Sequence, residues 1–282
     1  MTADVTERPE DPTGQPAGPD QARPSMSDGD DVARLMQLLH KADSVELKVT
    51  VPTDAQLSTI RSLPIDPIAA QTRQVFFFDT PDLDLDHAGV VVRARRSQGG
   101  RGDTVIKLRP VVPDELSPEL RRLGGFNIEV DVLPGGYMCS ASLKGRATVE
   151  EVKDAVQGRL KLSRLFAKDQ RAFFTEHAPA DIELDNLSVL GPTFVLKTAW
   201  DADVSDFGRT DVQRMVAELW LYPDGSRILE LSLRCPMSAA FQAAAEARAY
   251  LAAHGVHMGG EQQTKTRAAL QFYSAQLHAK AQ

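Results

Sequence analysis

Three pairs of charged residues combine a single sign with a spacing of two positions: Arg93–Arg95, Lys107–Arg109 and Glu129–Asp131. Each pair lies in a stretch where polar and apolar residues alternate. In a β-strand both members of a pair then share one face, and the apolar residues share the other. Like charges on one face repel each other unless groups of opposite sign lie beside them. The pairs therefore predict a surface on which basic and acidic strands come together.

Such a surface favours the binding of a polyanion together with a metal ion. Guanidinium and ammonium groups bind phosphate oxygens, whereas carboxylates alone would repel them. A divalent cation held by the carboxylates resolves this conflict because it bridges to phosphate. We interpret the pattern as a metal–triphosphate site, with basic residues at one end and acidic residues at the other. A solvent-exposed face of an ordinary antiparallel sheet explains the charges of any one strand about as well. A barrel that binds an apolar ligand is disfavoured, because its interior would not carry pairs of Arg and Lys.

The elements that would position these residues are mostly strands. Period-two alternation and turn signals predict strands at 44–51, 73–79, 90–96, 103–109, 126–132, 168–174, 181–187, 193–200, 215–222 and 227–235. Helices are expected at 53–62, 148–162, 238–254 and from 261 onward. Helices can cover the apolar strand faces, and the charged faces then point inward. This predicts an α+β fold: a closed or nearly closed antiparallel β-tunnel with helices packed outside.

The composition of the chain argues against nucleic-acid-binding and membrane-spanning proteins. The 282 residues carry a net charge of −7, which argues against a surface built for nucleic acid. No apolar stretch approaches the roughly 18 residues of a membrane helix. Cys139 and Cys235 lack metal-ligand spacing and are interpreted as reduced thiols of a cytoplasmic protein. The proline-rich residues 1–29 are predicted to be a disordered tail, and residues 30–282 to form a single domain.

Together these motifs resemble the CYTH superfamily, the triphosphate tunnel metalloenzymes. The resemblance begins at Ser44–Lys48 (SVELK) and is densest at Phe76–Arg95 (FFFDTPDLDLDHAGVVVRAR). It continues through Lys107–Arg109, Glu129–Asp131 and Glu230–Ser232. It implies a closed or nearly closed tunnel of eight antiparallel strands that hydrolyses a triphosphate with Mg²⁺ or Mn²⁺. Inorganic tripolyphosphate, thiamine triphosphate and nucleoside triphosphates are the candidate substrates.

The resemblance also implies roles for individual side chains. Those expected to hold phosphates are Lys48, Arg93, Arg95, Lys107, Arg109, Arg171 and Lys265. Those expected to hold metal or position water are Glu46, Glu129, Asp131 and Glu230, with Glu218 as a compensating carboxylate. Lys107 and Glu46 are expected to act in the catalytic step itself. Arg171 is chosen over Lys168 in the basic strand expected at 168–174, since both cannot face inward.

Two departures fall on the metal-binding half. Ser44 and Ser232 stand where the family pattern has glutamates, and serine is a poor ligand for a hard cation. Two functions therefore remain open: a metal-dependent triphosphatase and a non-catalytic polyphosphate or nucleotide binding module. In both, the expected partner is a phosphorylated small molecule, without nucleic acid or membrane. The Ala-rich helix at 238–254 offers a face for a homodimer, and the segment Ala199–Gln213 has no assigned role.

Overall fold

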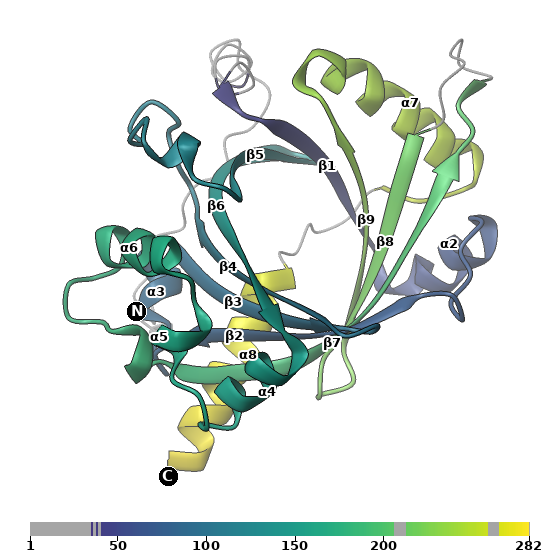
Figure 1. Ribbon diagram of the computed structural model, residues 1–282. Coiled ribbons are helices and arrows are strands. Elements are labelled where there is room, and N and C mark those ends of the chain that lie inside the picture. The colour runs from purple at the N-terminus through teal and green to yellow at the C-terminus, as the bar shows by residue number, and fades with distance from the viewer. Residues whose placement is uncertain (1–34, 36–37, 39–40, 206–212, 259–264, 282) are drawn as a thin grey trace, which may run out of the picture.

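In a computed structural model the chain closes into a β-barrel with helices around it (Figure 1). The structure describes residues 35, 38, 41–205, 213–258 and 265–281. The tail predicted at 1–29 and part of the segment Ala199–Gln213 lie outside the described residues. Among the described helices, none is both long and apolar enough to cross a bilayer.

Nine strands of the described chain make up the barrel. They are β1 (Ser44–Val51), β2 (Gln71–Asp79), β3 (Val90–Ser97), β4 (Arg101–Leu108), β5 (Phe126–Leu133), β6 (Gly136–Thr148), β7 (Ser188–Ala202), β8 (Gln213–Leu221) and β9 (Arg227–Cys235). Their order around the barrel is β1-β5-β6-β4-β3-β2-β7-β8-β9. The helices are α2 (Gln56–Ser62), α3 (Asp84–His87), α4 (Val149–Val156), α5 (Leu162–Leu165), α6 (Lys168–His177), α7 (Ala240–Ala253) and α8 (Lys265–Ala281).

The predicted α+β tunnel is confirmed, with one strand more than the eight expected. An odd number of strands cannot alternate in direction all the way around a closed barrel. One neighbouring pair must therefore be parallel, and this pair is β1 with β5. The parallel register places Glu46 opposite Asp131 and Ser44 opposite Glu129, so closure of the barrel joins two acidic strands directly.

Alternation along the strands separates an apolar outer layer from a charged interior. On β3, Val92 and Ala94 are fully buried in the outer core, whereas Arg93 and Arg95 point to the cavity. The outer core joins β2, β3 and β4 to α4, α5 and α6 through aromatic packing such as Phe78 against Phe166. Burying one such side chain contributes about 1.5–3 kcal/mol, so many apolar contacts hold the inward charges in place.

Three predicted elements differ from the structure. Residues 168–174 form helix α6 rather than a strand, because Lys, Gln, Arg and Ala favour a helix and the two phenylalanines lie on its buried side. Residues 184–186 form a single helical turn instead of part of a strand. Strand β6 was missed, since Gly, Ser and Ala dominate it and it is stabilised by pairing with both β4 and β5.

Helix α6 is tied to the barrel by Gln170, which is 1% exposed. Its amide nitrogen donates to the carbonyl oxygens of Leu143 and Thr104 at 3.0 and 3.3 Å. Its amide oxygen accepts from the Thr104 hydroxyl at 2.8 Å. A Cβ atom at Gly145 would lie 2.3 Å from that oxygen, so glycine is needed there for the helix to approach. This contact fixes α6 on the outer face of β4 and β6.

The C-terminal helix α8 is the exception to helices packed outside. Its buried face packs on Val75, Phe77, Val91, Trp220 and Ile228, and it lies beside β7 (Figure 1). These side chains share the inward face of their strands with cavity-lining residues such as Arg73 and Glu230. Helix α8 therefore occupies one end of the barrel and delivers Lys265 into the interior.

Candidate functional site

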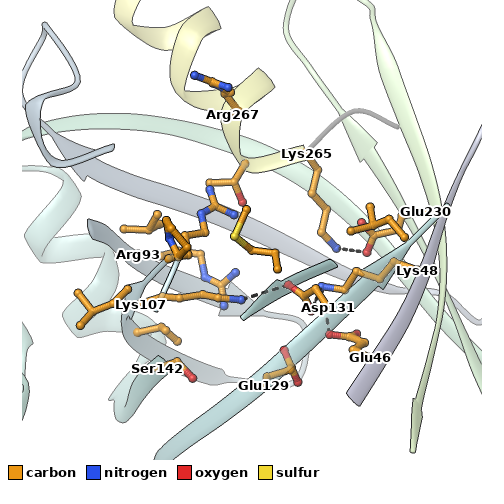
Figure 2. A pocket seen from close by; sticks show the side chains of 18 of the residues that line it. Glu46, Lys48, Arg93, Lys107, Glu129, Asp131, Ser142, Glu230, Lys265 and Arg267 are labelled. Atoms are coloured by element: carbon orange, nitrogen blue, oxygen red, sulfur yellow. Dashed lines mark hydrogen bonds and ion pairs between the residues drawn. The ribbon is translucent and has the colours of Figure 1, made fainter. Parts of the chain in front are cut away.

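The barrel encloses a cavity of about 2710 Å³ lined by charged side chains from β1, β3, β4, β5, β8 and β9 and from α8 (Figure 2). Most of its acidic and basic side chains come from opposite sides of the barrel, although the cations Lys48 of β1 and Arg234 of β9 lie on the acidic side. Carboxylates come from the adjacent strands β8, β9, β1 and β5, which we call the acidic wall. Cations from β6, β4, β3, β2 and β7 form the basic wall. The expectation that the two signs occupy opposite ends of the tunnel is therefore wrong: strand order sorts them around the circumference.

Three carboxylates of the acidic wall form a cluster. Glu46, Glu129 and Asp131 each offer an oxygen within 4.8 Å of the others. The parallel pairing of β1 with β5 creates this arrangement. Ser44, which lies opposite Glu129, has its hydroxyl 3.5 Å from a Glu129 oxygen. Ser44 thus lines the acidic cluster without adding a charge to it.

Two lysines cross-link this cluster through Asp131. Lys48 Nζ lies 2.8 Å from Asp131 and 3.2 Å from Glu46, and Lys107 Nζ lies 3.6 Å from Asp131. Burial alone would raise the pKa of Asp131, but Lys48 and Lys107 outweigh it and lower that pKa to about 2. Burial would lower the pKa of Lys48, yet Asp131 and Glu46 raise it above its ordinary value. Asp131 and Lys48 therefore form a permanently charged pair.

In the same cluster, the pKa of Glu129 is shifted in the opposite direction to that of Asp131. Burial, followed by repulsion from Glu46 and Asp131, raises the pKa of Glu129. The Arg234 guanidinium partly offsets this by bonding to Glu129, and it also lies 3.8 Å from Glu46. Arg234 was not predicted as a site residue. The signal was present, since it follows Glu230 and Ser232 at period two on β9.

A second acidic group lies further along the acidic wall. Glu218 and Glu230 are directly opposite each other on β8 and β9, and Lys265 of α8 bonds to both, reaching Glu230 at 2.7 Å. Burial would lower the pKa of Lys265, but Glu218 and Glu230 raise it. The five predicted metal-binding carboxylates therefore lie in two groups, and Lys265 neutralises one of them (Figure 2).

Replacing Lys265 by methionine should destabilise the fold by about 3 kcal/mol, because two buried carboxylates lose their shared counterion. Thermal unfolding in the absence of metal measures this. Adding Glu230→Gln to the same variant should recover much of the loss, since the remaining Glu218 still has Lys197 at 3.5 Å and Arg73 at 3.8 Å. A double variant no more stable than Lys265→Met would refute the counterion role.

The basic wall contains cations without a carboxylate partner. Arg95 makes a two-point contact with Asp103 across β3 and β4, with both of its donor nitrogens 3.0 Å from carboxylate oxygens. Arg93, the next inward residue, makes no ion pair within the described part of the chain, and its buried Nε has no hydrogen-bond partner there. Burial and then repulsion from Arg95 lower the pKa of Arg93 to about 10. Such a pair of arginines can be stabilised by an anion.

Further cations of the basic wall were not predicted: Arg73 on β2, Lys144 on β6 and Lys197 on β7. Arg73 and Lys197 are each the single cation on the inward face of their strand, so no pair of like charges signals them. Lys144 lies on the missed strand. Burial is the main cause that lowers the pKa of Lys144, and electrostatic repulsion from Arg234 is the second. Lys144 and Arg234 therefore interact electrostatically.

Arg109 and Arg171, which were also predicted to bind phosphate, differ in their surroundings. Arg109 follows β4, lines the cavity and lies 3.9 Å from Asp86. Arg171 lies on α6 outside the cavity lining, where its guanidinium donates to the carbonyl oxygens of Ser163 and Phe166 at 3.0 and 2.9 Å. Its prediction as a tunnel residue is wrong because residues 168–174 are helical.

The aspartate of the Asp79-Thr80-Pro81 motif also has a structural role. Its carboxylate, 2% exposed, accepts hydrogen bonds from the backbone nitrogens of Thr80, Leu85 and Asp86 at 2.7, 2.9 and 3.0 Å. It thereby fixes the turn that leads into β3. The motif positions the Arg93–Arg95 strand rather than contributing a ligand to the cavity.

The acidic cluster fits a hard divalent cation by its donor set. Carboxylate oxygens are the ligands that Mg²⁺ and Mn²⁺ prefer, and three of them converge at Glu46, Glu129 and Asp131. Serine at position 232 supplies no charge to this group, and it faces Lys48 across β9 and β1. The cluster of Glu46, Glu129 and Asp131 is therefore the part of the tunnel suited to a metal ion. The other two carboxylates, Glu218 and Glu230, are paired with the Lys265 ammonium group.

Comparison with known proteins supports the fold. No family model and no curated protein matches the sequence. A candidate adenylate cyclase from Bacillus halodurans has a similar structure at 12% identity, with a TM-score of 0.53 over 80% of this chain and 97% of that one. A candidate adenylyl cyclase from Hippeastrum, described as having a dominant triphosphatase activity, matches at 14% identity and a TM-score of 0.53 over 77% and 91%. These likenesses confirm the predicted fold, a closed β-tunnel with helices around it.

Proposed function

We propose that this protein hydrolyses a triphosphate inside the tunnel with the help of a divalent metal ion. The observation that carries the proposal is Arg93, which has a buried Nε and no ion pair among the described residues, beside Arg95 on one wall and facing three convergent carboxylates on the other. A bound triphosphate would supply the anion that the basic wall lacks. The triphosphatase activity described for the similar Hippeastrum protein agrees with this chemistry.

Phosphate binding would fall to the basic wall. Arg93 and Lys107 are inward on adjacent strands, and Lys144 lies beside them on β6. A terminal phosphoryl group held among them would have its charge stabilised by fixed cations. Arg109 would hold phosphates nearer the end of the tunnel that α8 occupies. The expected substrate is a phosphorylated small molecule, and the two free, buried cysteines accord with a cytoplasmic location.

Glu46, Glu129 and Asp131 would hold the metal ion. When bound, such an ion neutralises phosphate charge and polarises the terminal phosphoryl group. Glu46 would also accept a hydrogen bond from the attacking water and orient it toward the terminal phosphoryl group. Lys48 holds Glu46 and Asp131 in position through its two ion pairs. Positioning and charge stabilisation supply most of the catalysis in such reactions.

A phosphate-release assay with tripolyphosphate, thiamine triphosphate and ATP, in Mg²⁺, Mn²⁺ or EDTA, tests the proposal. Lys107→Ala should lower release by about 100-fold or more, since it removes a cation from the reacting group. Arg96→Ala is the matched control, because Arg96 shares β3 but bonds to Gln74 at 3.0 Å. Equal loss in both variants, or undiminished release by Lys107→Ala, would reject the site.

The alternative is a non-catalytic binding module for polyphosphate or nucleotide. Its support is that Glu46, Glu129 and Asp131 each already have a cationic partner in this chain, and that Ser44 and Ser232 add no metal ligand. In that case a binding titration would show tight, Lys107-dependent binding of tripolyphosphate, and no phosphate would be released with either metal.

A further inference from the structure

Arg234 contacts the acidic cluster in a way that the two cluster lysines do not. Its guanidinium bonds to Glu129 and lies 3.8 Å from Glu46, two of the three carboxylates. On β9 it stands directly opposite Glu46 of β1. Lys48 and Lys107 both pair with Asp131, and Lys48 also lies 3.2 Å from Glu46, but neither pairs with Glu129 among the described residues. Within the described residues, Arg234 is thus the cation that pairs with Glu129.

The three cations also differ in how easily they can leave. The side chains of Lys48 and Lys107 are 13% and 22% exposed, whereas that of Arg234 is 48% exposed. A half-exposed cation can exchange its carboxylate partner for water at a smaller cost than a largely buried one, although the Glu129 side chain is itself only 10% exposed. Arg234 can therefore swing away from Glu129 and Glu46, while Lys48 stays fixed between Asp131 and Glu46.

An anion in the cavity would give Arg234 a second partner. Arg234 lines the same cavity as Arg93 and Lys144, and its charge is felt at Lys144. A phosphate group placed between Arg234 and Lys144 would be attracted by both, and a guanidinium can bind it bidentately. The carboxylates that Arg234 leaves would then be free for a cation.

We propose that Arg234 is a tethered counterion that competes with the divalent metal for Glu129 and Glu46 and is drawn off by a bound phosphate group. The proposal rests on the proposed function, since it concerns the same metal cluster. Metal binding then becomes coupled to anion binding, and by linkage the coupling is reciprocal. In the absence of substrate the protein keeps its acidic cluster neutralised by its own arginine rather than by a metal ion.

Mn²⁺ binding followed by the electron paramagnetic resonance signal of free Mn²⁺ tests this without any turnover. Arg234→Gln should bind Mn²⁺ about tenfold more tightly than wild type, because a competing cation is gone. Arg234→Lys should stay close to wild type, since it keeps the charge. Arg214→Gln is the matched control: it also removes one arginine, but Arg214 pairs with the exposed Asp201 at 3.2 Å.

Inorganic phosphate provides the second measurement and needs no variant. Millimolar phosphate should tighten Mn²⁺ binding by wild type several-fold, after correction for Mn²⁺ bound by phosphate alone, and should have little effect on Arg234→Gln. Equal Mn²⁺ affinity in wild type, Arg234→Gln and Arg214→Gln, or equal phosphate effects in wild type and Arg234→Gln, would overturn the counterion role while leaving the triphosphatase proposal intact. Absence of Mn²⁺ binding in every variant, with and without phosphate, would reject both.

Discussion

Arg93→Met should lower triphosphate turnover by about 100-fold or more while leaving the fold at least as stable as wild type. The loss of activity follows from removing a fixed cation from the place where phosphate charge develops. The gain or preservation of stability follows because Arg93 lies half-buried beside Arg95 and has no carboxylate partner among the described residues. Phosphate release and thermal unfolding, measured on the same preparation, give both values.

The expected loss of turnover without a loss of stability distinguishes a functional role of Arg93 from a structural one. A residue that served mainly to stabilise the barrel would lower both activity and melting temperature when replaced. Arg96→Met, on the outer face of the same strand, should leave turnover unchanged. If Arg93→Met unfolds at a clearly lower temperature than wild type, or keeps its turnover, then Arg93 does not bind the phosphate of the substrate. The assignment of the basic wall as the phosphate-binding surface would then be wrong.

Asp131→Asn should lower both activity and stability. The isosteric amide removes one of the three carboxylates proposed to hold the metal and leaves Lys48 and Lys107, both largely buried, without their shared carboxylate. Breaking a buried ion pair from one side costs about 3 kcal/mol or more, which corresponds to a fall of roughly 6–12 °C in melting temperature for a chain of this size. Turnover should fall by at least about 100-fold, and Mn²⁺ binding should be lost.

The surface variant Asp201→Asn is the control for this change, because Asp201 is exposed and pairs with the exposed Arg214. It should shift the melting temperature by no more than about 1–2 °C. Stability of Asp131→Asn equal to that of wild type would mean that the cluster lysines have other partners, and unchanged turnover would exclude Asp131 from the metal site.

The inward faces were predictable where the sequence repeats a charge at period two. The inward orientation of Arg93–Arg95 and Glu129–Asp131 could be predicted from strand geometry alone, because the apolar core on the other face cannot accept two like charges side by side. The same rule applied one step further along β9 would have found Arg234. Single inward charges such as Arg73 carry no periodic signal, so only the closed barrel identifies them.

Other features depend on contacts distant in sequence. Strand β6 is rich in Gly and Ser, and it is a strand because β4 and β5 pair with it on both sides. The sorting of charges onto opposite walls follows from the strand order, which no local pattern contains. The same holds for Lys265, whose place between Glu218 and Glu230 depends on α8 entering the barrel.

One interior site is proposed to bring a metal ion and a phosphate chain together between the two walls. Anomalous diffraction from crystals soaked with Mn²⁺ and a non-hydrolysable triphosphate analogue would locate both. We predict an Mn²⁺ peak within coordination distance of Asp131 and Glu129, with phosphate density between that peak and Arg93. Ordered Mn²⁺ and phosphate found only on the outer surface, with the cavity holding water, would contradict the account.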